Sequence, residues 1–134
     1  MSLWLKVLLI GVAGALGALA RYGTHQLCTW ALRGYTPEGW VWSTLLANTL
    51  GCFLFGIVWA LTEGRWSGAV EIRHVVLVGF LGSFTTFSTF AFELVGFGQN
   101  QRYLMLCLHL SAHLSLGVAG VVLGLWLGHR LVGT

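Results

Sequence analysis

Long apolar runs separated by short polar stretches make up almost the whole chain. The charge-poor runs cover residues 3–20, 40–61, 75–97 and 103–128. An α-helix needs roughly 20 apolar residues to cross the hydrocarbon core of a bilayer. The pattern therefore predicts an all-α membrane protein, a single transmembrane domain over residues 1–134, with four spans at about 3–32, 40–61, 75–97 and 103–130.

The connections between these runs are short. The longest, over about residues 24–39, contains the only proline, Pro37. The others cover about residues 64–74 and 98–102. Proline and glycine in such stretches favour turns. None of the connections leaves room for a soluble domain.

The first run has an alternative interpretation as a secretory signal. Lys6 precedes an apolar run that ends in Ala-Leu-Ala at 18–20, which imitates a small-residue cleavage site. However, Gly11, Gly14 and Gly17 suit the packing of a membrane helix. Because three further runs require a membrane in any case, we interpret the first run as a span.

The composition agrees with a membrane protein and excludes an ordinary soluble domain. Hydrophobic residues make up 57% of the chain and charged residues only 8%, against about 25% in soluble domains. Cys28, Cys52 and Cys107 are odd in number and widely spaced, so they are interpreted as packing thiols. The net charge of +3 comes from loop cations and indicates no nucleic-acid partner. The chain has no nucleotide loop or nucleophile pattern, so no enzyme is expected.

Positively charged residues predict the orientation of a membrane protein, and here they are almost balanced. Four cations lie on the side of the termini and three on the other: Lys6, Arg65, Arg73 and Arg130 against Arg21, Arg33 and Arg102. The chain is therefore expected to insert in both orientations. Two oppositely inserted copies can pair as an antiparallel homodimer, the two-chain equivalent of an inverted repeat.

Small residues at a spacing of four predict close contact between helices. Such residues occur in the last run and in the first: Gly120, Gly124 and Gly128, and Ala13 with Gly17 or Gly14 with Ala18. We interpret these stripes as support for a dimer, since four helices alone pack as a solid bundle. The alternative is that the stripes serve packing within one chain.

The third run, GFLGSFTTFSTFAFE at 79–93, is unusually rich in hydroxyl groups. Glycine, β-branched and hydroxyl residues weaken a regular helix, so a break is predicted where Gly79 and Gly82 are followed by Thr85 and Thr86, at about Gly82 to Thr85. A broken membrane helix frees carbonyls that can hold a small hard cation. The alternative is a continuous helix whose hydroxyls bond to the preceding turn.

Two faces follow the predicted break. Phe87 and Phe90 share one face, whereas Thr86, Thr89 and Glu93 share another. Aromatic rings have an electropositive edge, so two rings presented edge-on can coordinate an anion. The alternative is that the two rings simply fill a core.

Polar residues in the second and fourth runs also require an explanation, because they are costly in lipid. Thr44 and Asn48 lie one helical turn apart, and Asn48 can donate two N–H groups to an anion or bond helices together. His109, His113 and Gly117 form a stripe that is either a polar track or a set of interhelical hydrogen bonds. With no cysteine or acid at ligand spacing, a metal site at these histidines is not expected.

Three motifs stand out along the chain: GALGALARY (14–22), NTLGCFLFG (48–56) and GFLGSFTTFSTF (79–90). Together they resemble the CrcB/Fluc family of fluoride channels, and the last carries the specific TTFSTF element of that family. The resemblance extends over the whole chain in length, number of spans and order of motifs. It implies an antiparallel, dual-topology homodimer with two pores in the inner membrane that passively exports fluoride, excludes chloride and confers fluoride resistance.

The resemblance also implies roles for individual residues. Phe87 and Phe90 would present ring edges to fluoride and Asn48 would donate to it, with polar contacts from Ser88, Thr86 and Thr44. Carbonyls from Gly82 to Thr85 would hold a structural sodium ion at the dimer interface. Arg21 and Glu93 match charged positions of the family pattern, and Arg21 would concentrate anions in a vestibule.

The fourth run departs from the family pattern. Relatives carry a hydroxyl-lined track where this chain has His109, His113 and Gly117. Because imidazole titrates near physiological pH, we hypothesise that conductance depends on pH.

Two other functions remain open on sequence alone. A proton-coupled small multidrug exporter would need an acid facing a drug pocket, and Glu93 is the only carboxylate within a run. If the chain were a non-transporting assembly protein, the presence of Asn48 and of the face formed by Phe87 and Phe90 would have no functional explanation.

Overall fold

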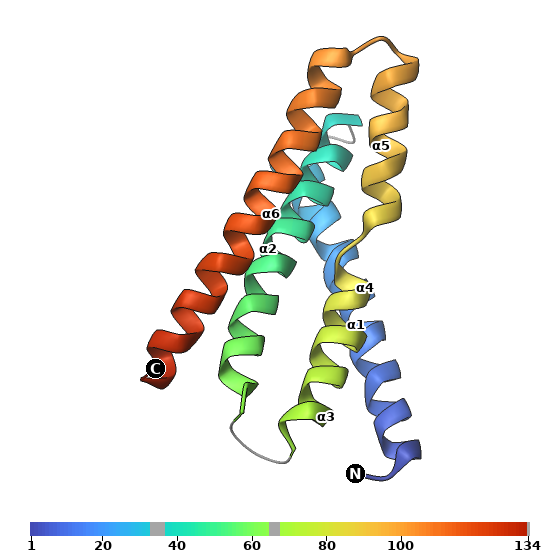
Figure 1. The fold of residues 1–134 in the computed structure, drawn as a ribbon. Coiled ribbons are helices and arrows are strands. Elements are labelled where there is room, and N and C mark those ends of the chain that lie inside the picture. Colours follow the sequence, from blue (N-terminus) through green and yellow to red (C-terminus); the bar gives the residue numbers. More distant parts are fainter. Residues whose placement is uncertain (33–36, 65–67, 134) are drawn as a thin grey trace.

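The computed structural model of the chain describes residues 1–32, 37–64 and 68–133, which form a bundle of helices (Figure 1). The helices are α1 (Leu3–Ala31), α2 (Pro37–Thr62), α3 (Ala69–Arg73), η1 (His74–Leu81), α4 (Gly82–Phe84), α5 (Phe87–Gln99) and α6 (Tyr103–Val132). These described ranges contain no strand. Four stretches are long and apolar enough to cross a membrane: Leu3–Ala31, Trp40–Thr62, Ala69–Gln99 and Tyr103–Val132. The prediction of an all-α protein with four spans is therefore confirmed.

The first two spans lie where they were predicted, but the non-helical stretch between α1 and α2 is shorter than the polar stretch over 24–39. The helix α1 ends at Ala31, as expected from the predicted span over about 3–32, and α2 begins at Pro37, so the polar stretch over 24–39 is mostly helical and not a long connection. The Thr24 and Thr29 hydroxyls donate to carbonyls four residues earlier, at 3.0 and 2.9 Å, so these residues stay helical despite their polarity. Two of the cations counted for orientation, Arg33 and Arg65, lie outside the described residues.

The third span is composite, and its break is confirmed. It changes from a short α-helix to a wider π-helical segment, η1, then to α4, and resumes as α5. Thr85 and Thr86 between α4 and α5 are extended, with φ/ψ of −87°/159° and −151°/118°. Gly82 is still helical at −61°/−30°, so the break lies after Gly82 and not at it. In Figure 1 this break crosses the middle of the bundle.

The small residues of the two stripes pack within one chain. A Cβ atom added at Gly124 of α6 would lie 2.1 Å from the Phe53 carbonyl oxygen of α2. One added at Gly17 of α1 would lie 2.1 Å from the Phe80 carbonyl oxygen of η1. These glycines therefore bring α6 against α2 and α1 against the third span, which is the alternative interpretation of the stripes. They offer no support for a dimer.

Alanine at Gly17 or Gly124 is expected to destabilise the protein by about 1–3 kcal/mol, because the added methyl group meets backbone that cannot move aside. Thermal unfolding of the purified protein in detergent measures this loss. Gly11→Ala is the control for Gly17→Ala on the same helix, since a Cβ at Gly11 meets nothing within 4 Å. Equal melting temperatures for Gly17→Ala and Gly11→Ala would contradict the packing described here.

Candidate functional site

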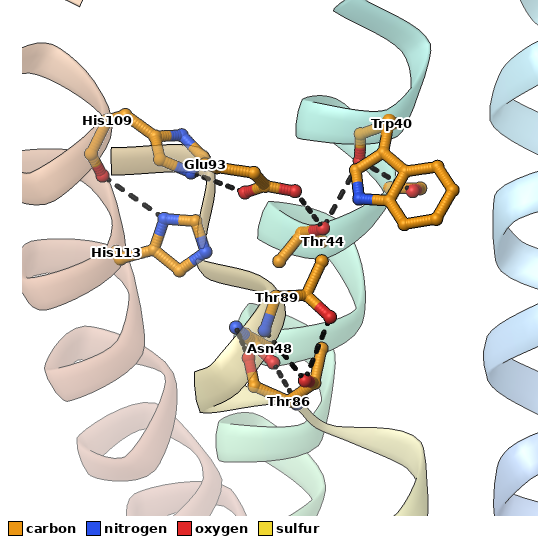
Figure 2. Close-up of polar contacts among 9 residues, drawn as sticks. Trp40, Thr44, Asn48, Thr86, Thr89, Glu93, His109 and His113 are labelled. Atoms are coloured by element: carbon orange, nitrogen blue, oxygen red, sulfur yellow. Dashed lines mark hydrogen bonds and ion pairs between the residues drawn. The ribbon is translucent and has the colours of Figure 1, made fainter. Parts of the chain in front are cut away.

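The break in the third span is held open by one amide side chain. Asn48 of α2 donates from Nδ2 to the Thr86 carbonyl oxygen at 3.1 Å, and its Oδ1 accepts from the Thr86 amide at 2.8 Å (Figure 2). The pair of bonds replaces the helical partners that Thr86 lacks. Asn48 thus bonds two spans together, as the alternative interpretation held. The second hydrogen on Nδ2 is not used in this pair of bonds.

Hydroxyl groups cap the start of α5. Thr86 Oγ1 accepts from the Thr89 amide at 3.2 Å, which satisfies one of the free N–H groups at the helix N-terminus. The same oxygen lies 3.1 Å from Thr89 Oγ1 and 3.2 Å from Ser88 Oγ. Thr85 instead donates to the Leu81 carbonyl oxygen at 2.9 Å. The hydroxyls that the sequence singled out therefore stabilise the break itself.

The Phe87 and Phe90 rings meet at the first turn of α5. Their centroids are 5.8 Å apart and their planes are inclined by 60°, so the edge of one ring approaches the other. Phe90 is buried at 7% exposure, whereas Phe87 is 78% exposed. The prediction of a shared face is confirmed in part: the rings touch, but only Phe90 is enclosed by its own chain.

Both rings line a hollow of about 590 Å³, which we name the phenylalanine hollow. Its lining also includes Asn48, Cys52, Leu81, Thr86 and His113. A ring edge and a spare amide hydrogen are both electropositive, so the walls of this hollow can attract an anion without carrying a full charge.

A second hollow of about 640 Å³ contains the vestibule candidate, Arg21, and is named the arginine hollow. Its polar lining comes from α1, α2 and α5: Arg21, Tyr22, His25, Gln26, Trp40, Ser43, Thr44, Thr86 and Thr89. Thr86 lines both hollows. A cation that lines a hollow raises the local concentration of anions there. Thr86, which lines both hollows, is also the residue whose backbone is bonded to Asn48.

Glu93 is not in either hollow but is bonded to two neighbouring spans (Figure 2). Its Oε1 accepts from the Thr44 hydroxyl of α2 at 2.6 Å, and its Oε2 lies 2.8 Å from His109 Nε2 of α6. All three residues are buried, at 4–7% exposure. A buried carboxylate is tolerated when both of its oxygens are bonded in this way. Thr44 therefore bonds to Glu93 and lines the arginine hollow but not the phenylalanine hollow.

The two histidines of α6 lie next to each other and to Phe90. The His113 ring is 4.2 Å from the Phe90 ring and 4.3 Å from the His109 ring, measured between centroids. His113 Nδ1 lies 3.1 Å from the His109 carbonyl oxygen. The missing side chain at Gly117 leaves room beside Cys52, whose Sγ is 3.6 Å from where a Cβ would be. Only His113 of this stripe lines the phenylalanine hollow.

Sequence comparison identifies the family. The sequence model described as "CrcB-like protein, Camphor Resistance (CrcB)" matches residues 8–125, most of the chain. The chain is 46% identical over 127 residues to a protein named fluoride-specific ion channel FluC from Nitratidesulfovibrio vulgaris, covering 95% of this chain and 98% of that one. Proteins of the same name from Nitrosococcus oceani and Solidesulfovibrio magneticus are 44% and 45% identical, over 91% and 95% of this chain and 94% and 98% of theirs. With more than half of its length matched, the chain belongs to the CrcB-like family.

Proposed function

We propose that this protein is a passive, fluoride-selective channel of the inner membrane that exports fluoride and confers resistance to it. The relatives reported above are named fluoride-specific ion channels. The observation that carries the proposal is the phenylalanine hollow, where two ring edges, an amide and a broken helix meet in an apolar span.

The chemistry of the hollow suits a small, strongly hydrated anion. A pore must replace the water around the ion with donors, yet bind it weakly enough to let it leave. The edges of Phe87 and Phe90 and the second N–H of Asn48 offer partial positive charge at this place. A permanent positive charge in the same position would hold the anion more tightly and slow its release. Larger halides fit a narrow file of ring edges less well.

A second copy of the chain is required to complete such a pore. Phe87 is 78% exposed, so one side of the rings would face lipid in a single chain. Two copies inserted in opposite orientations would enclose the rings and form two equivalent pores. Opposite insertion agrees with the nearly equal numbers of cations on the two sides of the membrane. Light scattering is expected to give twice the chain mass of 14.6 kDa after subtraction of detergent. In a variant whose only cysteine is one added at the C-terminus, a membrane-impermeant thiol reagent should label about half of the copies.

The break also suits a structural sodium ion at the proposed dimer interface. The Thr86 amide is bonded to Asn48, so it does not reach the Gly82 carbonyl four residues earlier. The last carbonyls of a helix such as α4 have no partner within the helix, and carbonyl oxygens are the ligands that a hard cation prefers. Carbonyls from Gly82 to Thr85 of two copies would hold this ion, which would fix the two breaks to each other.

Reconstitution in liposomes tests the proposed function. A fluoride electrode is expected to record rapid fluoride release, a chloride electrode no release, and neither result should depend on a proton gradient. Fluoride that stays trapped by folded, inserted protein, or equal release of chloride, would refute the proposal. A proton-coupled drug exporter is not favoured, since it needs an open acid, whereas Glu93 is buried and bonded through both oxygens.

A further inference from the structure

Among the described residues that line the phenylalanine hollow, only His113 has an imidazole side chain, a group that can gain a proton and a positive charge. A carbonyl oxygen only accepts hydrogen bonds, so the contact between His113 Nδ1 and the His109 carbonyl oxygen requires a hydrogen on Nδ1. In the neutral ring, Nε2 then carries no hydrogen and presents a lone pair. The backbone of α6 thus decides which nitrogen of His113 is the donor.

The Nε2 atom is buried and has no hydrogen-bond partner among the described residues. Figure 2 shows it on the side of the ring turned away from the α6 backbone, facing the space toward Thr89 and Asn48. A buried polar atom without a partner costs about 1–3 kcal/mol. A proton, or a ligand that brings one, would remove this cost.

An anion beside the neutral ring would instead be repelled by the lone pair of Nε2. The neutral ring therefore differs from a hydroxyl group, which can turn its hydrogen toward an anion without gaining a proton. With a proton on Nε2, the ring becomes an N–H donor with a positive charge, next to the electropositive edge of Phe90. We propose that His113 forms a subsite where the halide binds together with one proton.

The proton and the halide can be arranged in two ways that have the same composition. In one, imidazolium donates to fluoride; in the other, hydrogen fluoride donates to Nε2. In both, one proton from water reaches Nε2 as the halide enters the hollow, the halide occupies the unpaired side of Nε2, and the proton returns to water when the halide leaves. Chloride has only the first arrangement, because its acid is fully dissociated in water.

The neighbouring titratable groups permit this proton. From α5, Glu93 is bonded to His109, which lies on the same helix as His113. With one ionising proton between them this pair has no net charge, and without it the pair is negative; only a proton carried on the His109 ring, 4.3 Å from the His113 ring, would oppose one on His113. From α2, Cys52 lines the same hollow and is neutral as a thiol. Thr44 and Asn48 on α2 do not titrate.

This inference rests on the proposed conduction of fluoride and predicts a measurable link between fluoride and pH. At pH values where the His113 ring is neutral in the absence of fluoride, the fluoride Kd should fall about tenfold for each unit fall in pH. Up to one proton should be taken up for each fluoride bound. Sodium fluoride added to purified, weakly buffered protein should therefore raise the pH of the solution. Binding avoids the leak of hydrogen fluoride that complicates flux measurements in acid.

His113→Gln and His113→Ser are expected to bind fluoride without taking up protons, since amide and hydroxyl groups donate without titrating. His74→Gln is the matched control: His74 Nδ1 also contacts a carbonyl four residues earlier, that of Val70, but the residue lies outside the hollow. It should take up protons as the unaltered protein does.

Two failures are distinguishable in this experiment. Fluoride binding by the unaltered protein without proton uptake would overturn the role of His113 and leave the channel intact, as would equal uptake by the His113 variants. Absence of both fluoride binding and fluoride release by folded protein would overturn the proposed function itself. Even if a variant fails to fold, addition of sodium fluoride to the unaltered protein still tests the proposal, because binding without proton uptake would overturn it.

Discussion

Replacing Phe87 and Phe90 together by leucine is expected to lower fluoride release on the order of 100-fold or more. Leucine keeps the apolar character of both positions but has no electropositive edge. A desolvated cation over the face of an aromatic ring gains about 2 kcal/mol, and we take an anion at the oppositely charged edge to gain a similar amount; a loss of about 2.7 kcal/mol already lowers a rate about 100-fold. Release of fluoride from liposomes at equal protein content measures the effect.

Phe92→Leu is the matched control for this double variant. Phe92 lies on the same helix and is 76% exposed, much as Phe87 is, but it does not line the hollow. Its replacement should change fluoride release by no more than about twofold, since no ring edge near the proposed path is lost. A folded double variant that releases fluoride as fast as the Phe92 variant would refute the role of the two rings.

The overall fold was readable from sequence because its signal is strong and local. A run of about 20 apolar residues has few outcomes other than a membrane helix. The break was readable for the same reason, since two adjacent threonines after two glycines oppose a regular helix. Its position was less clear from helix propensity alone: Gly82 remains helical directly after η1, which lies against α1 where Gly17 meets Phe80.

The contacts between spans could not be predicted in the same way. Helical spacing groups residues that lie on one helix, so the sequence placed Thr44 with Asn48 and Glu93 with Thr89. The structure instead joins Thr44, Glu93 and His109 from three different helices. Such a contact depends on the rotation of each helix in the bundle, which glycines such as Gly124 determine through close backbone approach. The same limit explains why the glycine stripes were assigned to a dimer.

The arrangement around Thr86 connects these separate features. Thr86 lines both hollows, caps α5 with its hydroxyl and exchanges two backbone bonds with Asn48. An anion moving from the arginine hollow to the phenylalanine hollow would therefore pass beside this residue. The geometry at that passage depends on one amide of α2, because no helical hydrogen bond fixes the extended backbone there.

Asn48→Ala and Asn48→Asp are expected to separate the structural role of this amide from its role toward the anion. Alanine removes both bonds to Thr86, so it should cost about 1–3 kcal/mol of stability and reduce fluoride release. Aspartate keeps an oxygen that accepts from the Thr86 amide but loses the Nδ2 donor and adds negative charge. It should therefore lower fluoride release more than alanine does, on the order of 100-fold, because like charge near the path repels the ion by a few kcal/mol.

Asn100→Ala provides the control for loss of an amide that only caps a helix. Asn100 Nδ2 donates to the Gly96 carbonyl oxygen at 2.8 Å at the exposed end of α5, far in sequence from the break. Its loss should leave fluoride release unchanged within about twofold, since an exposed bond contributes only about 0.5–1.5 kcal/mol. If Asn48→Asp released fluoride as fast as Asn100→Ala, the amide would act only as a clamp on Thr86. The anion would then have to be bound by the rings, His113 and the hydroxyl groups of Thr85 and Thr86, because no other donor of α2 lines the phenylalanine hollow among the described residues apart from the Cys52 thiol.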